Sequence, residues 1–380
     1  MGKFSWRHFD FWLLGAVAFL TIFGITMIRS AIAGNIELVE ADTVLKQIIF
    51  ASGGFVIMII TAIIDYRYWG AVSGILYALT AGALGVLFLF GGALFGSARW
   101  FSVGPILIQP SEIAKVTVIL ILADFLSRNI ERIKKPATIV RSLLLTLGIV
   151  VWIILQPDLS TSIVILVLWF ALVWAAGLDT KLLLTAAGIG LLVLAVALPL
   201  LLINYDPNST TGLIKGYQVG RIVNFLFPDP NASYGAIYNV QQALISIGDG
   251  GWFGQGYGSG SQVQLRFLKV RHSDFIFSAL SEEFGFVGAL GVIGVLAFII
   301  ARCLRAARLS SDTYGALIAY GVATLLSFQT IVNIGMNLNL LPVTGLTLPF
   351  VSYGGSSLVT LFIGIGLVES VLLRHKDLEF

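Results

Sequence analysis

Charged residues are scarce in this chain of 380 residues, because Asp, Glu, Lys and Arg together make up only 11% of it. Soluble globular proteins carry roughly 25% charged residues. Hydrophobic residues account for 57% of the chain, and the mean hydropathy is +0.94. This composition excludes an ordinary soluble domain and favours a protein whose surface largely faces lipid.

Cysteine and histidine are also rare. Cys303 is the single cysteine, which excludes an internal disulfide. The three histidines, His8, His272 and His375, show no spacing typical of a metal site. The chain has no phosphate-binding loop of the nucleotide-hydrolase type and no dinucleotide fingerprint. Nothing in it indicates a soluble nucleotide or a nucleic acid as a ligand.

Long uncharged runs dominate the sequence. Residues 70–98 and 182–203 contain no charged side chain, and a membrane-spanning helix needs about 20 apolar residues. We therefore expect an all-α polytopic membrane protein that forms one domain over residues 1–380. Ten transmembrane helices are predicted, at residues 11–31, 45–64, 70–95, 110–127, 141–156, 160–177, 182–203, 275–301, 313–337 and 352–373.

The distribution of basic residues predicts the orientation. An even number of spans places both termini on one side, and 14 of the 23 Lys and Arg residues lie on that side. Lys and Arg are enriched in cytoplasmic loops. Both termini are therefore predicted to be cytoplasmic.

One connection, residues 204–273, lies between the seventh and eighth predicted spans, on the outer face. It holds 11 of the 41 glycines and five of the nine outer basic residues. Loops of this length are usually functional or disordered. Its segments 214–227 and 238–247 have helix-like apolar spacing, so we expect short helices at the outer interface or dipping into the bundle.

Ionisable residues within spans are candidates for function, because the membrane makes them costly. Glu112 and Lys115 are three residues apart, which puts them on one helix face as a structural or a functional ion pair. Asp158 lies in a tight turn and suits a helix N-cap. Glu282 and Glu283 lie roughly 12–14 Å into the membrane, where they either bond neighbouring helices or take part in catalysis.

Two further features lie at the outer mouth of the predicted bundle. Asp274 opens the eighth span as an N-cap or as an acid–base group beside a cationic, glycine-rich loop. Residues 341–357 are rich in proline and glycine, which break helices at the membrane edge. This segment is either a re-entrant loop that lines a cavity or an ordinary tight connector.

Five ordered motifs carry a resemblance over nearly the whole chain. They are QPSEIAK at 109–115, QPDLSTS at 156–162, GGWFGQGYGSGSQVQLRFL at 250–268, HSDFIFSALSEEFGFVG at 272–288 and LPVTGLTLPFVSYGGSS at 341–357. The chain resembles the SEDS family (shape, elongation, division and sporulation), and within it the RodA branch more than the FtsW and SpoVE relatives. It departs from the family pattern at Ser160, where glycine is usual, at residues 269–271 and at Asn339.

The resemblance implies a peptidoglycan glycosyltransferase of the bacterial cytoplasmic (inner) membrane, active in cell elongation. Such an enzyme polymerises lipid II, an undecaprenyl-pyrophosphate-linked disaccharide pentapeptide, into glycan strands at the outer face. Its expected partners are a class B penicillin-binding protein and other membrane proteins of the elongation complex. Asp274 matches the family's essential aspartate, and Glu112 and Lys115 match its interacting pair.

These expectations assign roles to individual residues. Asp274 is the expected general base, and Glu112, Lys115, Asp158 and Glu283 are expected to support the site. Lys115 either contacts the substrate pyrophosphate or is held by Glu112. Binding of the pyrophosphate and the sugars is assigned to Arg221, Gln242, Arg266, Lys269, Arg271, His272 and Ser356.

Other possibilities remain open from the sequence. A divalent cation, Mg or Mn, could assist the reaction, although no dedicated metal site is visible. The chain could instead be a flippase that moves lipid II across the membrane, or a non-catalytic scaffold that activates the penicillin-binding protein.

Overall fold

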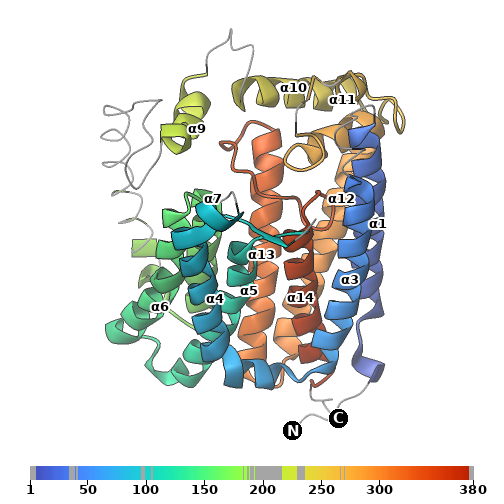
Figure 1. Ribbon diagram of the computed structural model, residues 1–380. Helices are drawn as coiled ribbons and strands as arrows, with labels where there is room; N and C mark the ends of the chain where they lie inside the picture. Colours follow the sequence, from blue (N-terminus) through green and yellow to red (C-terminus); the bar gives the residue numbers. More distant parts are fainter. Residues whose placement is uncertain are drawn as a thin grey trace.

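The protein forms a bundle of long helices that run side by side (Figure 1). The computed structural model describes residues 6–33, 39, 42–95, 99–103, 106–182, 184–185, 188, 192, 216–228, 236–265, 267–268 and 270–375. The long helices in these ranges are α1 (Phe11–Ile32), α3 (Thr43–Ile63), α4 (Tyr66–Phe95), α5 (Pro110–Arg128), α6 (Pro136–Leu155), α7 (Leu159–Ala175), α12 (Ile276–Leu309), α13 (Thr313–Asn337) and α14 (Gly355–Leu372).

The helices identify an integral membrane protein. Within the described ranges, seven helices are long and apolar enough to cross a membrane. Of the other two long helices, α5 carries four charged residues and α7 has 17 residues. All nine coincide with predicted spans, whereas the predicted span 182–203 lies largely outside the described residues. The structure also contains a feature that an all-α prediction omits, an antiparallel hairpin of β1 (Phe101–Val103) and β2 (Ile106–Ile108).

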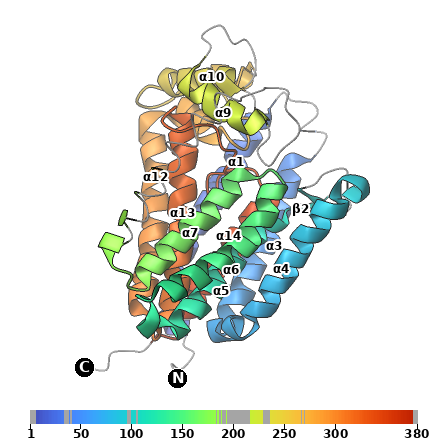
Figure 2. The same ribbon diagram turned by 90° about the vertical axis from the view of Figure 1, so that its left-hand side faces the viewer.

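A layer of short helices lies across one end of the bundle (Figures 1 and 2). It consists of α9 (Gly216–Leu226), α10 (Ala236–Asp249) and α11 (Ser261–Gln264). The first two confirm the helices predicted near 214–227 and 238–247. At the opposite end the described chain ends meet, because the rings of His8 and His375 lie 4.1 Å apart. A 3-10 helix, η1 (Trp6–His8), leads into α1 there, and a second, η2 (Ile130–Arg132), follows α5.

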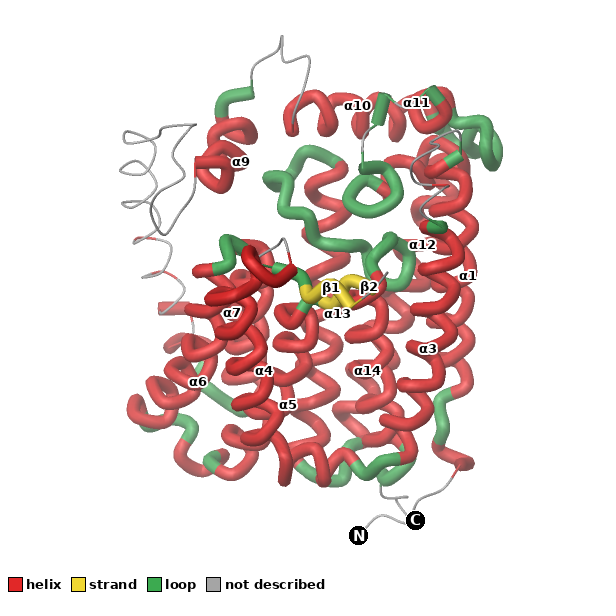
Figure 3. Tube along the Cα trace, in the orientation of Figure 1, coloured by secondary structure: helices red, strands yellow, loops and turns green. Residues whose placement is uncertain are grey.

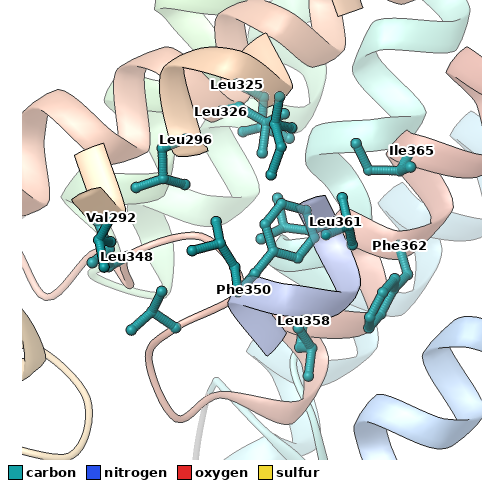
Figure 4. Packing of buried hydrophobic residues seen from close by; sticks show 14 of the residues in the cluster. Val292, Leu296, Leu325, Leu326, Leu348, Phe350, Leu358, Leu361, Phe362 and Ile365 are labelled. Carbon is teal, nitrogen blue, oxygen red and sulfur yellow. The ribbon is translucent and has the colours of Figure 1, made fainter. Parts of the chain in front are cut away.

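The segment between α13 and α14 enters the bundle (Figure 3). Its Leu348 and Phe350 are buried and pack against residues of α12 and α14 in the main hydrophobic core (Figure 4). Helix α1 passes close by, since a Cβ on Gly24 would lie 2.7 Å from the Phe350 carbonyl oxygen. The part of the segment from Leu346 to Ser352 is therefore mostly buried in the packed interior, whereas Leu340 nearer its start is exposed.

Helix α12 is kinked in its N-terminal part, where Gly285 has φ 67° and ψ −167°. The kink leaves backbone N–H and C=O groups without partners in the helix. Buried groups of this kind bond to another segment of the chain or to water. Residues 251–256 supply the partners here. The four bonds are Gln255 N to Glu282 O at 2.9 Å, Gly256 N to Glu283 O at 3.0 Å, Phe286 N to Gly251 O at 2.9 Å and Val287 N to Trp252 O at 3.1 Å.

Gly254 lies in this insertion, and its replacement by alanine should destabilise the protein. Gly254 has φ +81°, and a Cβ there would clash with the Glu283 backbone. The left-handed conformation alone costs a non-glycine residue about 1–2 kcal/mol. We expect Gly254→Ala to lower the thermal unfolding temperature in detergent by several degrees.

Gly248→Ala is the matched control, because Gly248 lies in α10 and a Cβ there meets nothing within 4 Å. This control should match or slightly exceed the wild-type stability, since alanine favours a helix. Equal unfolding temperatures for the two variants would contradict the packing described for residues 251–256.

Candidate active site

A cavity of about 570 Å³ lies where the bundle meets α9. Its wall combines the N-terminal parts of α3, α5 and α7, the hairpin, the segment before α12 and the segment between α13 and α14. Six of the residues predicted for the site line it together: Glu112, Asp158, Arg221, His272, Asp274 and Ser356.

Asp274 presents a carboxylate with few partners to this cavity. It immediately precedes Phe275, the N-cap of α12, and is half-buried. Ser273 Oγ donates to Asp274 Oδ1 at 3.1 Å, and a Cβ on Gly345 would lie 3.6 Å from Oδ2. Burial raises the pKa of Asp274, and the Ser273 hydrogen bond and the nearby Arg221 charge partly offset this rise. Among the described residues the carboxylate therefore keeps lone pairs without a donor, and its burial makes it more basic, as a proton acceptor requires.

Asp158, the other aspartate of the cavity, accepts hydrogen bonds at both carboxylate oxygens. Thr161 N and Oγ1 donate to its two oxygens at 3.2 and 2.9 Å, which makes Asp158 the N-cap of α7. Gln109 Nε2 and Ser111 Oγ donate to Oδ2 at 3.2 and 3.3 Å. The local N-cap interpretation thus describes Asp158, and its role in the site is to join α5 to α7.

The cationic side chains of the cavity are Arg221, Lys46 and Arg99. Arg221 Nη1 donates to Thr344 O at 2.8 Å, so the guanidinium stays beside Asp274. Arg99 Nε donates to Gln156 O at 2.9 Å. Lys46 and Arg99 were not predicted for the site, because their only signal in the sequence is a position on the outer side.

Lys115 is held by Glu112 and does not line the cavity. The two side chains form the expected ion pair, with Lys115 Nζ 2.6 Å from Glu112 Oε2, and Lys115 is fully buried. Glu112 itself reaches the cavity wall. Of the two roles considered for Lys115, the geometry supports the pair with Glu112.

Three other predicted residues lie away from the cavity lining. Arg271 is buried, and its guanidinium donates to the carbonyls of Ala31 in α1 and of Leu268, so it does not line the cavity. Glu283 is buried and accepts from Ser30 of α1. Gln242 lies on α10, outside the lining. Arg266 and Lys269 lie outside the described residues.

His272 and Ser356 connect the parts of the cavity wall. Tyr353 N donates to His272 O at 2.9 Å, and the two rings lie 5.7 Å apart. Burial and the adjacent Arg271 charge lower the pKa of His272, which favours its neutral form. The Ser356 hydroxyl accepts from Gln109 N at 3.1 Å and donates to Leu107 O at 3.0 Å.

Within the described residues no group of three His, Cys, Asp or Glu side chains suits a metal ion, so the side chains present do not fit a dedicated metal site.

The family model for cell cycle proteins of the FtsW, RodA and SpoVE type matches residues 11–377. The chain belongs to the FtsW/RodA/SpoVE family. It is 35% identical over 388 residues to the probable peptidoglycan glycosyltransferase FtsW of Saccharophagus degradans, covering 99% of this chain and 94% of the relative. It is 33% identical over 372 residues to the peptidoglycan glycosyltransferase MrdB of Escherichia coli K12, covering 98% of this chain and 95% of the relative.

Solved structures of this family share the fold. A chain from work on the structural coordination of polymerization and crosslinking by a peptidoglycan synthase complex superposes with a TM-score of 0.77, at 30% identity, over 98% of this chain and 100% of that one. The rod shape determining protein RodA of Thermus thermophilus superposes with a TM-score of 0.69, at 30% identity, over 98% of this chain and 99% of that one.

Two features of this member of the FtsW/RodA/SpoVE family escaped prediction. Ser160 donates its hydroxyl to Thr344 O at 2.6 Å and so joins α7 to the carbonyl that also accepts from Arg221. Asn333 and Asn337 bond the backbone of Asp274. The available signal was their polarity within the apolar segment 313–337, which marks intramembrane residues as functional candidates.

Proposed function

We propose that the protein is a peptidoglycan glycosyltransferase that polymerises lipid II at the outer face of the bacterial cytoplasmic membrane during cell elongation. The observation that carries this proposal is the Asp274 carboxylate, which faces a cavity beside Arg221 and accepts a single described hydrogen bond. The names of the curated relatives, peptidoglycan glycosyltransferases FtsW and MrdB, support it.

In the proposed reaction, Asp274 takes the proton from the 4-hydroxyl of the acceptor sugar. The hydroxyl oxygen attacks the anomeric carbon of the donor, the bond to the pyrophosphate oxygen breaks, and undecaprenyl pyrophosphate leaves. This single displacement inverts the anomeric configuration from α to β. Arg221 stabilises the negative charge that develops on the leaving pyrophosphate, because a preorganised cation in a partly buried site lowers the barrier.

The proposed placement in the membrane puts this cavity outside the cell. We propose ten spans, with both termini in the cytoplasm and residues 204–273 on the outer face. The opposite positions of α9–α11 and of the His8–His375 contact support this arrangement. Reporter fusions at the C-terminus should therefore behave as cytoplasmic, and a periplasmic signal would reverse the orientation.

The proposed partners are a class B penicillin-binding protein, which crosslinks the strands, and other membrane proteins of the elongation complex. The similarity to a chain of a peptidoglycan synthase complex supports a polymerase that works beside a crosslinking enzyme. A contribution of Mg or Mn stays a proposal, and no step above runs through a metal. Chelation by EDTA in the assay below tests it.

The decisive experiment supplies purified lipid II to the purified protein in proteoliposomes, with and without the penicillin-binding protein. We expect glycan strands that a muramidase digests. Fluorescent lipid II in the same vesicles measures transfer between the leaflets. If lipid II moves between the leaflets and no polymer forms, the protein is a flippase and the proposal is wrong. If the penicillin-binding protein makes the polymer by itself, this protein is a scaffold.

A further inference from the structure

Two buried asparagines of α13, one helical turn apart, converge on one backbone carbonyl. Asn333 Nδ2 and Asn337 Nδ2 each donate to Asp274 O, both at 3.1 Å. Both asparagines have no exposed surface. A polar side chain in a membrane helix is costly unless it is bonded, so this double contact requires an explanation.

The same two side chains also bond two other segments. Asn333 Nδ2 also donates to Leu346 O at 2.7 Å, in the segment between α13 and α14. Asn337 Oδ1 accepts from Ser278 N at 3.2 Å and from Ser278 Oγ at 2.6 Å, in the first turn of α12. The pair thus connects the start of α12 with the segment between α13 and α14, which lines the cavity.

The connected wall includes the backbone nearest to the Asp274 carboxylate. Leu346 follows Gly345, whose missing Cβ would lie 3.6 Å from Asp274 Oδ2. It also lies two residues after Thr344, whose carbonyl accepts from Arg221 at 2.8 Å. The separation between Asp274 and Arg221 therefore depends on how α13 places these two segments.

We propose that Asn333 and Asn337 are positioning residues that set the place of the Asp274 carboxylate relative to Arg221 and the bound acceptor. This inference rests on the proposed polymerase function. A misplacement of about 1 Å in a catalytic group can cost about 100-fold in rate. The two amides act on Asp274 through its main chain, so their loss should affect the chemical step more than substrate binding.

The test is the kinetics of lipid II polymerisation by Asn337→Ala and Asn333→Ala in the full-length protein with its partner. We expect kcat to fall by about 10-fold to 100-fold while KM for lipid II stays within about threefold. Gln329→Ala is the matched control. Gln329 lies one and two turns earlier on α13, is buried, and neither of its amide atoms has a hydrogen-bond partner among the described residues. It should keep wild-type kcat.

Asn337→Asp separates the bond to the Asp274 carbonyl from the bonds to Ser278 in the first turn of α12. It retains the side-chain shape and an oxygen that can accept from Ser278, and it removes the amide that donates to Asp274 O. We expect it to share the loss of kcat. Wild-type kcat in folded Asn337→Asp and Asn337→Ala would overturn the inference, as would equal losses in kcat for Gln329→Ala.

The outcomes also separate this inference from the proposed function. If the wild-type protein makes no polymer, the proposed function fails. If the wild type polymerises lipid II and Asp274→Asn does not, while the asparagine variants keep wild-type kcat, only the positioning role fails. If no asparagine variant yields folded protein, the amides serve folding and the positioning role is wrong.

Discussion

Replacing Asp274 with asparagine is expected to reduce the rate of lipid II polymerisation by about 100-fold to 10,000-fold, the range that general acid–base groups contribute. Asparagine has nearly the shape of aspartate but cannot accept the proton of the attacking hydroxyl. The Ser273 hydrogen bond has an acceptor oxygen in either residue. Binding of lipid II should therefore change little, which a binding measurement on the purified variant will check.

Asp249→Asn provides the control for this variant. Asp249 is exposed at the end of α10 and lies outside the cavity lining, so it should retain the wild-type rate. If Asp274→Asn polymerises lipid II as fast as the control, Asp274 is not the base.

The pH dependence of the polymerisation rate provides a second test of Asp274 as the base. Burial raises the pKa of Asp274, and only its deprotonated form can act as a base. The rate should therefore decline as the pH falls through this raised pKa, at a higher pH than for an ordinary aspartate, whose pKa is about 3.9. A rate that stays constant down to about pH 4 would contradict this assignment.

Breaking the Glu112–Lys115 pair is expected to cause the largest loss of stability. Lys115→Met leaves the Glu112 carboxylate without its partner at 2.6 Å. The Glu112 side chain is 11% exposed and the Lys115 side chain 1%. Removal of one member of a buried ion pair typically costs about 3–5 kcal/mol, because the other charge stays buried and uncompensated. Glu112→Gln should destabilise the protein for the same reason.

The double variant distinguishes pairing from simple loss of packing. Because neither charge remains, Glu112→Gln with Lys115→Met should cost less than the sum of the single changes. Thermal and denaturant unfolding in detergent measure all three. Additive losses would mean that the two charges do not stabilise one another.

Helix α5 also supplies a matched control pair. Arg128 Nε lies 2.9 Å from Asp124 Oδ1, four residues apart, and the Arg128 side chain is 67% exposed. Exposed pairs contribute about 0–1 kcal/mol, so Arg128→Gln should have a small effect. A comparable loss for Arg128→Gln and Lys115→Met would argue against burial as the cause.

Local patterns were sufficient for much of the fold. Uncharged runs predicted the positions of the helices, because covering a membrane requires about 20 apolar residues wherever the helix packs. The i, i+3 spacing predicted the Glu112–Lys115 pair, since residues three apart share a helix face. The N-cap role of Asp158 depends only on the adjacent turn of α7.

The family motifs located the site but not the direction of each side chain. Arg221 and Arg271 belong to the same basic, glycine-rich connection, and both were assigned to the substrate. Arg221 faces the cavity, whereas Arg271 bonds the carbonyl of Ala31 in α1. This difference depends on how α9 and the segment before α12 pack against the bundle, which sequence spacing does not specify.

The sequence by itself therefore determined that the protein is a helical membrane protein with Asp274 at the mouth of a bundle. Both properties follow from composition and from motifs contiguous along the chain. Only the tertiary structure decided which groups surround Asp274: Arg221 from α9, Gly345 from the segment after α13, and the amides of Asn333 and Asn337. The physical reason is that these contacts join residues 53 to 71 positions apart along the chain, so they exist only once α9, α12 and α13 have packed.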